Sequence, residues 1–289
     1  MEQIAVSRRL MADVLAQFHM QQARNERDDA LVAELSTLLA ARRESPVLHV
    51  SCFGTFRLAG EGGWETGPQP KRGRELMQYL ALYPARSVAR ERLSELFWPE
   101  LDAEAVAHRL HIAASGARTF LRELLHGFDA IRCTPEGYAW HPAVHVVTDV
   151  ARFSDLYRDG SPAALEDAAT LYSGELFEGE SGDWLQPARV KYATMHTSIV
   201  GRLADDAFAR GDYDRALGHG LELLGIDRAH EGASRLVMRC FGALGRRARA
   251  LAEFEALRAY LKRHLGVEPM AETTRLIDRI LREENLAAG

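Results

Sequence analysis

The second half of the chain resembles itself when it is shifted by 34 residues. The shift superposes identical residues at five pairs of positions: Gly211 and Gly245, Arg215 and Arg249, Ala216 and Ala250, Leu217 and Leu251, and Leu223 and Leu257. A period of 34 residues is that of the tetratricopeptide helix pair. In such a pair a glycine ends the turn, a small alanine allows the helices to approach closely, and leucines fill the seam. The repeat therefore predicts an α-helical solenoid.

Hydrophobic residues recur at helical spacing from Val150 onward. Within this stretch, the segment from Pro162 to Leu176 has the pattern expected for the second helix of a degenerate first repeat. Together with the two units found by the shift, it makes three stacked helix pairs, the usual minimum for a stable solenoid. Residues 149–285 are therefore predicted to form an all-α, tetratricopeptide-like domain.

The pattern differs between residues 47 and 148. It begins with a β-rich stretch from Leu48 to Leu58 and a shorter extended piece, which predict a small antiparallel sheet. Three helical patterns follow over residues 71–82, 88–98 and 103–125, and Asp102 is placed to cap the third. Residues 130–140 then form a hairpin pattern with a turn at Thr134-Pro135-Glu136-Gly137. This order of elements is that of a winged helix with an amino-terminal sheet.

Residues 1–45 carry helical hydrophobic stripes with polar opposite faces. Such an amphipathic extension covers either the body of its own chain or a partner, such as a second copy. Ser45-Pro46 ends the pattern, because the residue before a proline is biased away from helical backbone. The fold class predicted for the chain is mainly α: a winged helix-turn-helix followed by an all-α repeat domain.

The third helix of a winged helix enters the major groove of DNA, and the hairpin reaches the adjacent minor groove or backbone. The helix over residues 103–125 has one apolar face for packing and an opposite face of side chains that can bind bases or phosphates. The candidate contacts on it are His108, Arg109, His111, Ser115, Arg118 and Arg122. The candidate phosphate contacts are Lys71, Arg72 and Arg74 in the first helix and Arg132 in the hairpin.

The charge balance limits what a DNA site can rest on. The chain has 36 Lys+Arg against 41 Asp+Glu, a formal net charge of −5, and residues 47–150 hold 11 basic and 12 acidic side chains. Affinity for DNA must then come from a few arginines on one helix and its flanks. The alternative is a ligand-sensing or protein-interaction module whose winged helix no longer binds DNA.

Short motifs over both halves resemble those of one known family. In the first half they are Pro70-Lys71-Arg72, Val88-Ala89-Arg90-Glu91-Arg92-Leu93, Phe97-Trp98, His108-Arg109-Leu110-His111 with Ser115 and Arg118, and Gly137-Tyr138. In the second half they are Asp149-Val150-Ala151-Arg152-Phe153, Asp183-Trp184-Leu185 and Leu265-Gly266-Val267-Glu268-Pro269. Their order resembles the Streptomyces antibiotic regulatory protein family, in which an OmpR-type winged helix precedes a bacterial transcriptional activation domain of tetratricopeptide repeats.

The resemblance implies a transcriptional regulator, more specifically an activator, that recognises direct repeats in promoter DNA and contacts RNA polymerase. Direct repeats imply tandem or dimeric binding, so a homodimer through residues 1–45 or through the repeat domain is one alternative. A small-molecule effector in the groove of the repeat domain is another. The family commonly has serine at the position of Ala89, so the second helix must start from Ser87 or from packing.

The sequence does not indicate catalysis. The paired groups His108 with His111, His141 with His145, and Glu283 with Glu284 lack the third ligand or the spacing of a metal or acid/base site. The glycines at 60 to 63 lack the Lys-Ser/Thr of a phosphate-binding loop. We expect no enzyme activity, no metal and no cofactor.

Three scattered cysteines, Cys52, Cys133 and Cys240, fit a reducing compartment and are predicted to be buried. No apolar run is long enough to span a membrane, and the first residues include Arg8 and Arg9 where a signal peptide would be apolar. We expect a cytoplasmic, nucleoid-associated protein without a membrane partner.

Overall fold

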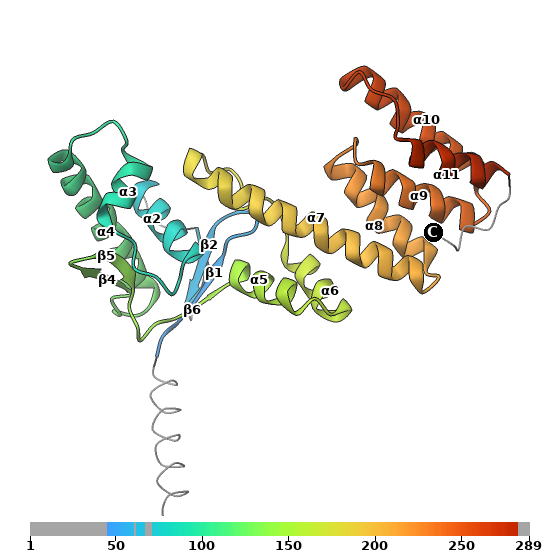
Figure 1. Ribbon diagram of the computed structural model, residues 1–289. Helices are drawn as coiled ribbons and strands as arrows, with labels where there is room; N and C mark the ends of the chain where they lie inside the picture. Colours follow the sequence, from blue (N-terminus) through green and yellow to red (C-terminus); the bar gives the residue numbers. More distant parts are fainter. Residues whose placement is uncertain (1–44, 61, 67–70, 283–289) are drawn as a thin grey trace, which may run out of the picture.

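The computed structural model describes residues 45–282 except for residue 61 and residues 67–70 (Figure 1). The extension predicted over residues 1–45 therefore lies outside the described residues but for Ser45. The described chain is mainly helical, with a mixed α/β part followed by an all-helical part, and this confirms the predicted fold class. None of the described helices is both long and apolar enough to cross a membrane.

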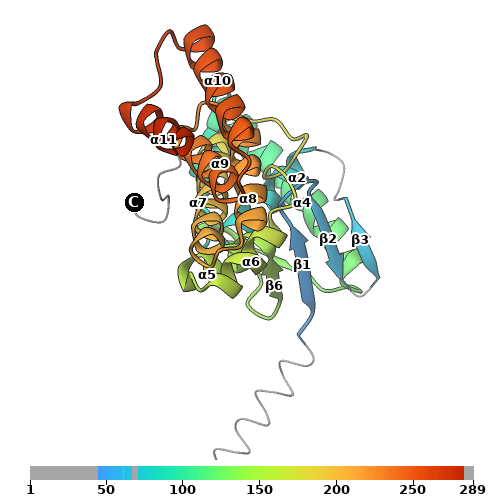
Figure 2. The ribbon, with the colours of Figure 1, turned by 90° about the vertical axis from the view of Figure 1, so that its right-hand side faces the viewer.

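The first part contains a four-stranded sheet with the strand order β3-β2-β1-β6 (Figure 2). Its strands are β1 (Val47–Ser51), β2 (Arg57–Gly60), β3 (Gly63–Glu65) and β6 (His145–Thr148). The first three are antiparallel, as predicted, whereas β6 lies parallel to β1, with Leu48 opposite Val146. The sequence prediction missed β6, because a short strand whose partner lies far away in the sequence carries little pattern of its own.

Three helices follow the sheet and agree with the predicted ranges to within two residues: α2 (Lys71–Leu82), α3 (Arg90–Phe97) and α4 (Ala103–Leu124). Asp102 caps α4 as predicted, since its carboxylate accepts a hydrogen bond of 2.8 Å from the N–H of Ala105. One face of α4 is buried against the other helices through Val106, Leu110, Ala113, Ala117 and Leu121. The opposite face of α4 is therefore exposed to solvent.

The predicted hairpin is present as β4 (Ile131–Thr134) and β5 (Gly137–Trp140). The N–H of Val88 donates to the carbonyl of Tyr138 at 2.8 Å, and the N–H of Tyr138 donates back at 3.0 Å. This bridge fixes the chain just before α3, where Ala89 provides no side-chain cap. Gly137 is required here, because a Cβ atom would lie 1.9 Å from the carbonyl oxygen of Val88.

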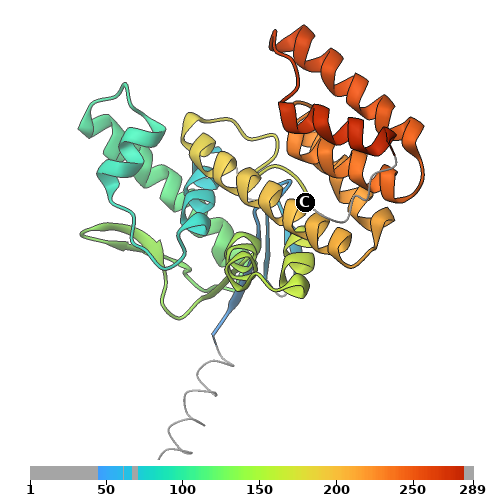
Figure 3. The same cartoon turned by 45° about the vertical axis from the view of Figure 1, so that its right-hand side comes forward.

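The second part is a stack of helices (Figure 3). They are α5 (Asp149–Asp159), α6 (Pro162–Leu171), α7 (Gln186–Ala209), α8 (Tyr213–Ile226), α9 (Glu231–Ala243), α10 (Arg247–His264) and α11 (Ala271–Leu281), with a 3-10 turn η1 (Asp183–Leu185) before α7. Consecutive helices from α5 to α11 pack on one another across their turns, and α11 also contacts α9. This is the arrangement expected of stacked helix pairs.

The 34-residue repeat corresponds to two successive helix pairs, α7 with α8 and α9 with α10. Gly211 and Gly245 end the turns with φ angles of 79° and 70°, a conformation that favours glycine. Ala216 and Ala250 are fully buried in the seams. Leu251 departs from the pattern, because it is 38% exposed although its counterpart Leu217 is buried.

One hydrophobic core continues from the sheet and the three helices after it into α5, α6 and α7. The ring of Phe53, just after β1, lies 5.0 Å from that of Phe153 in α5 and 5.6 Å from that of Tyr192 in α7. The carboxylate of Asp149 accepts hydrogen bonds from the N–H groups of Cys52 and Phe53. The hydrophobic core is therefore continuous across residues 148–149, where β6 ends and α5 begins.

The segment between α6 and α7 adds a second connection to the sheet. Backbone hydrogen bonds join Gly54 N–H to the carbonyl of Glu175 at 3.0 Å and Phe177 N–H to that of Cys52 at 2.8 Å. Arg189 in α7 holds the same segment, because its guanidinium donates to the carbonyls of Leu176, Phe177 and Glu180. These contacts fix α7 relative to the sheet.

Candidate nucleic-acid interface

The solvent side of α4 carries most of the predicted DNA contacts. His108, Arg109, His111, Ser115 and Arg122 are exposed, and Arg118 is partly exposed. Ile112 lies among them and is 48% exposed, although it is a large hydrophobic residue. The sequence prediction missed Ile112, because residue type alone assigns isoleucine to a core. An exposed apolar side chain among donors suits contact with a thymine methyl group.

A hollow of about 230 Å³ separates this face of α4 from the hairpin. It is lined by His111, Ser115, Arg118 and Arg122 from α4 and by Cys133 and Tyr138 from the hairpin, together with Ala114 and Thr119. α4 and the hairpin are thus adjacent, which is the arrangement of the two DNA-contacting elements in a winged helix.

An ion pair that the sequence did not suggest holds two of these arginines. Nε of Arg118 donates to Oδ1 of Asp129 at 3.0 Å, and its Nη2 donates to Oδ2 of the same carboxylate. Nη2 of Arg122 lies 3.4 Å from Asp129 Oδ2. The hydrogen bond with Arg118 lowers the pKa of Asp129 below its ordinary value. Asp129 therefore stays ionised and occupies hydrogen-bonding positions of Arg118 that a phosphate group could otherwise use.

The hairpin contributes an exposed cation, Arg132 in β4, as predicted. A second cation, Arg90 at the start of α3, was not predicted. Its Nη2 donates to the carbonyl of Thr134 at 3.1 Å and to Sγ of Cys133 at 3.2 Å. Arg90 therefore fixes the hairpin turn against α3 and adds positive charge beside the hollow.

Lys71, Arg72 and Arg74 lie elsewhere, at the contact between α2 and the segment before α7. Nζ of Lys71 lies 3.0 Å from Oγ of Ser181, and Nε of Arg74 lies 3.1 Å from a carboxylate oxygen of Glu180. Arg72 pairs with Glu75, and its guanidinium lies over the ring of Trp98 at 5.3 Å. The structure therefore engages all three side chains within the chain and does not bring them to the hollow beside α4.

Two of the three cysteines are buried, but the predicted burial of Cys133 was wrong. Cys52 and Cys240 are fully buried, whereas Cys133 is exposed in β4. Cys133 is exposed although it lies on the same side of β4 as the buried Ile131, because it is closer to the hairpin turn and lines the hollow beside α4. Within the described part of the chain, no three His, Cys, Asp or Glu side chains are grouped so that they could hold a metal ion.

Comparison with known proteins agrees with this architecture. Residues 148–281 match the family of the bacterial transcriptional activator domain. The regulatory protein AfsR of Streptomyces coelicolor is 26% identical over 261 residues, which is 85% of this chain and 25% of AfsR. A solved structure of Mycobacterium tuberculosis EmbR, in complex with a low affinity phosphopeptide, is 17% identical with a TM-score of 0.70, and the match covers 83% of this chain and 66% of that one.

The likeness to EmbR shows the fold, and the match to AfsR extends the relationship over both parts of the chain. This chain spans a quarter of the length of AfsR and about two thirds of the EmbR chain. The matched domain family is one of transcriptional regulators and not of enzymes, and AfsR is described as a regulatory protein. Residues 148–281 therefore match the bacterial transcriptional activator domain, and the chain is a distant homologue of AfsR, in agreement with the predicted resemblance to the Streptomyces antibiotic regulatory protein family.

Proposed function

We propose that the protein is a sequence-specific DNA-binding transcriptional activator that recruits RNA polymerase to promoters carrying direct repeats. The observation that carries the proposal is the exposed face of α4 beside the hairpin, the two elements with which winged helices contact DNA. The residues that read the major groove are His108, Arg109, His111, Ser115, Arg118 and Arg122, and Arg132 binds the backbone beside it.

The basic side chains of α2 have a smaller part in this proposal. Lys71 and Arg72 keep 47% and 41% of their side-chain surface exposed, so they remain accessible to phosphates at a place separate from the hollow beside α4. Arg74 is only 21% exposed and is paired with Glu180. We assign Arg74 mainly to the contact between the two parts of the chain.

The charges within the chain imply modest affinity of one protomer for DNA. Asp129 neutralises Arg118 and part of Arg122, and residues 47–150 have no excess of basic residues. Useful occupancy then requires a second protomer on the neighbouring repeat, or contact of the repeat domain with RNA polymerase. Because promoter DNA and RNA polymerase lie in the bacterial cytoplasm, we place the protein there.

The ion pairs between these basic side chains and carboxylates of the same chain favour one alternative function. It is a ligand-sensing or protein-interaction module whose winged helix no longer binds DNA. In that case the carboxylates of Asp129, Glu75 and Glu180 are permanent partners of the basic side chains. A mobility-shift assay distinguishes the two functions, because DNA binding must fall steeply with added salt.

The assay uses genomic promoter fragments and compares wild type with Arg109→Ala. Arg109 is exposed on α4, and loss of a guanidinium contact to a base should weaken specific binding by about 1–3 kcal/mol, or roughly fivefold to 150-fold. The control is Arg152→Ala, which removes the same charge from the exposed side of α5. If no fragment is retarded at low salt, or if both variants behave as wild type does, the protein is not a DNA-binding regulator of this kind.

A further inference from the structure

A groove of about 760 Å³ runs along the repeat domain between α7, α9 and α11. Its size is within the range of ligand sites in proteins. Four arginines line it: Arg235 and Arg239 on α9, and Arg275 and Arg279 on α11. Among the described residues, the acidic side chains that line it are Asp205 and Glu272, so this part of the lining has more basic than acidic side chains.

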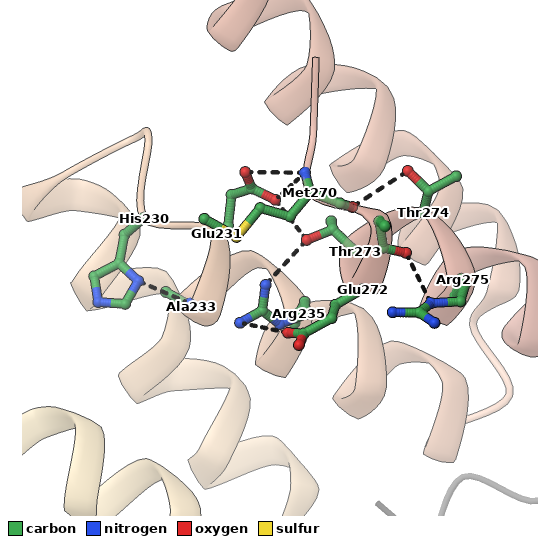
Figure 4. A network of polar contacts seen from close by, with 10 residues as sticks. His230, Glu231, Ala233, Arg235, Met270, Glu272, Thr273, Thr274 and Arg275 are labelled. Carbon is green, nitrogen blue, oxygen red and sulfur yellow. Dashed lines mark hydrogen bonds and ion pairs between the residues drawn. The ribbon is translucent and has the colours of Figure 1, made fainter. Parts of the chain in front are cut away.

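The arginines form two matching pairs. On each helix the two residues are four positions apart, which places them one turn, about 6 Å, from one another along the axis. The beginnings of α9 and α11 lie together, since the N–H of Met270 donates to Glu231 at 2.9 Å (Figure 4). The groove thus presents two neighbouring rows of cations with the same spacing.

Contacts within the protein hold part of these rows in place. Nη1 of Arg235 donates to Oγ1 of Thr273 at 3.1 Å, and the hydroxyl of Thr273 donates to Glu231 (Figure 4). The guanidinium of Arg239 lies 4.1 Å from the ring centroid of Phe208. Glu272 offers only weak competition for Arg235, because the two charged groups are 3.7 Å apart and Glu272 is 68% exposed.

Two further features of the groove suit an acidic chain. The first turn of α9 borders it through Gly232 and Ala233, and the positive end of a helix dipole favours negative groups. Leu223, Leu236 and Leu276 also line it, and because they are almost fully buried they form an apolar floor beneath the charged side chains. A ligand that satisfies both features is acidic and amphipathic.

We propose that this groove binds an acidic, amphipathic peptide segment of a partner protein. Carboxylates four residues apart on a helix are about 6 Å apart along its axis, and carboxylates two residues apart on an extended chain are about 6.7 Å apart. Either spacing matches the arginine rows, whereas a small inorganic anion would use only one or two of the four guanidinium groups. The inference goes beyond the proposed DNA-binding function and does not depend on it.

The test measures fluorescence anisotropy of two labelled peptides of about 15 residues with the full chain. One carries glutamates four residues apart with leucines between them, and the other carries glutamates at alternate positions of an extended sequence. Each of the two has a matched control peptide in which glutamine replaces every glutamate. We expect at least one acidic peptide to bind, the glutamine peptides to bind at least about tenfold more weakly, and affinity to fall between about 50 and about 300 mM NaCl.

The decisive variants are Arg275→Gln, at an exposed position, and the double variant Arg239→Gln with Arg275→Gln. The double variant should weaken binding by roughly tenfold or more. Arg263→Gln on the exposed surface of α10, outside the groove, should leave binding unchanged. Circular dichroism melting of each variant confirms that the helices are folded.

Any of four outcomes would overturn the inference. One is the absence of binding by both acidic peptides at low salt. Another is equal binding of the acidic and glutamine peptides. A further one is unchanged affinity of Arg275→Gln and of the double variant for the acidic peptide. The last is complete displacement of the peptide by millimolar inorganic phosphate, which would identify the groove as a small-anion site.

Discussion

Arg118 of α4 and Asp129 of the turn before β4 form a two-point ion pair inside the proposed DNA-binding face. The carboxylate orients the guanidinium and also cancels its charge. Both side chains keep about a third of their surface exposed, at 38% and 33%, so a phosphate can reach the arginine. Under the proposed function, Asp129 competes with DNA phosphates for Arg118.

Replacing Asp129 with asparagine should raise DNA affinity. Removal of the carboxylate frees Arg118 and Arg122 for phosphates or bases, and we expect a gain of roughly threefold to tenfold at low salt. Stability should fall by at most about 1 kcal/mol, because the ion pair is partly exposed. Mobility-shift titrations and thermal melting measure the two effects.

Glu136→Gln is the matched control for this variant. It removes one negative charge from the exposed turn of the same hairpin without touching Arg118. If Glu136→Gln and Asp129→Asn raise affinity equally, then total charge accounts for the effect and the ion pair has no special role.

Phe53 should couple the stability of the sheet to that of the first repeat helices. Its ring contacts Phe153, Tyr172 and Tyr192, so Phe53→Ala should cost about 3–5 kcal/mol. Because the core is continuous, tryptophan fluorescence and circular dichroism should shift together to a lower melting temperature.

Tryptophan fluorescence reports on the part of the chain that precedes the last repeat helices, since all four tryptophans lie at or before Trp184. Leu276→Ala in α11 is the control, because Leu276 belongs to a separate cluster at the far end of the repeats. It should destabilise those helices and leave the fluorescence transition nearly unchanged. Two separate transitions in the wild-type fluorescence melt would contradict the shared core.

His196 should make the protein less stable in mild acid. It is buried in α7, and its ring stacks on that of Tyr172 with 4.1 Å between centroids. Burial lowers its pKa below the ordinary value of 6.5, with an opposing effect of Glu222. As the pH falls below about 6.5, the unfolded chain takes up a proton that the folded state resists, so the free energy of unfolding decreases.

Urea unfolding at pH values between about 7 and about 5 measures this dependence. His196→Phe keeps an aromatic ring on Tyr172 without a titrating group, so its stability should vary less with pH. The control is His264→Phe, at an exposed histidine that stacks on Tyr260 in the same way. Identical pH dependence in wild type and His196→Phe would exclude His196 as the cause.

Cys133 should be the most reactive of the three thiols. Burial raises the pKa of Cys52 well above its ordinary value and that of Cys240 to about 11, whereas Cys133 is exposed beside the hollow. One equivalent of N-ethylmaleimide should therefore modify Cys133 first, as peptide mass spectrometry would show.

The modified protein should bind DNA more weakly, because the adduct occupies the hollow between α4 and the hairpin. Cys133→Ser should bind DNA normally and resist the reagent. Rapid labelling of Cys240 in the native protein, or full DNA binding after modification of Cys133, would disagree with the structure.

The sequence by itself determined the local elements and their order. The ranges of α2, α3 and α4, the cap at Asp102 and the repeat at Gly211 and Gly245 follow from hydrophobic period and turn chemistry, which depend on neighbours a few residues away. These signals were sufficient for the fold class and for the exposed polar face of α4.

Only the tertiary structure decided which charges are paired and which surfaces meet. Lys71 meets Ser181 across 110 residues of sequence, and β6 joins β1 from beyond the hairpin. The arginine rows of the groove likewise combine α9 with α11. Such contacts depend on how whole elements pack, and a charged side chain has the same appearance in a sequence whether it faces water, a carboxylate or a ligand.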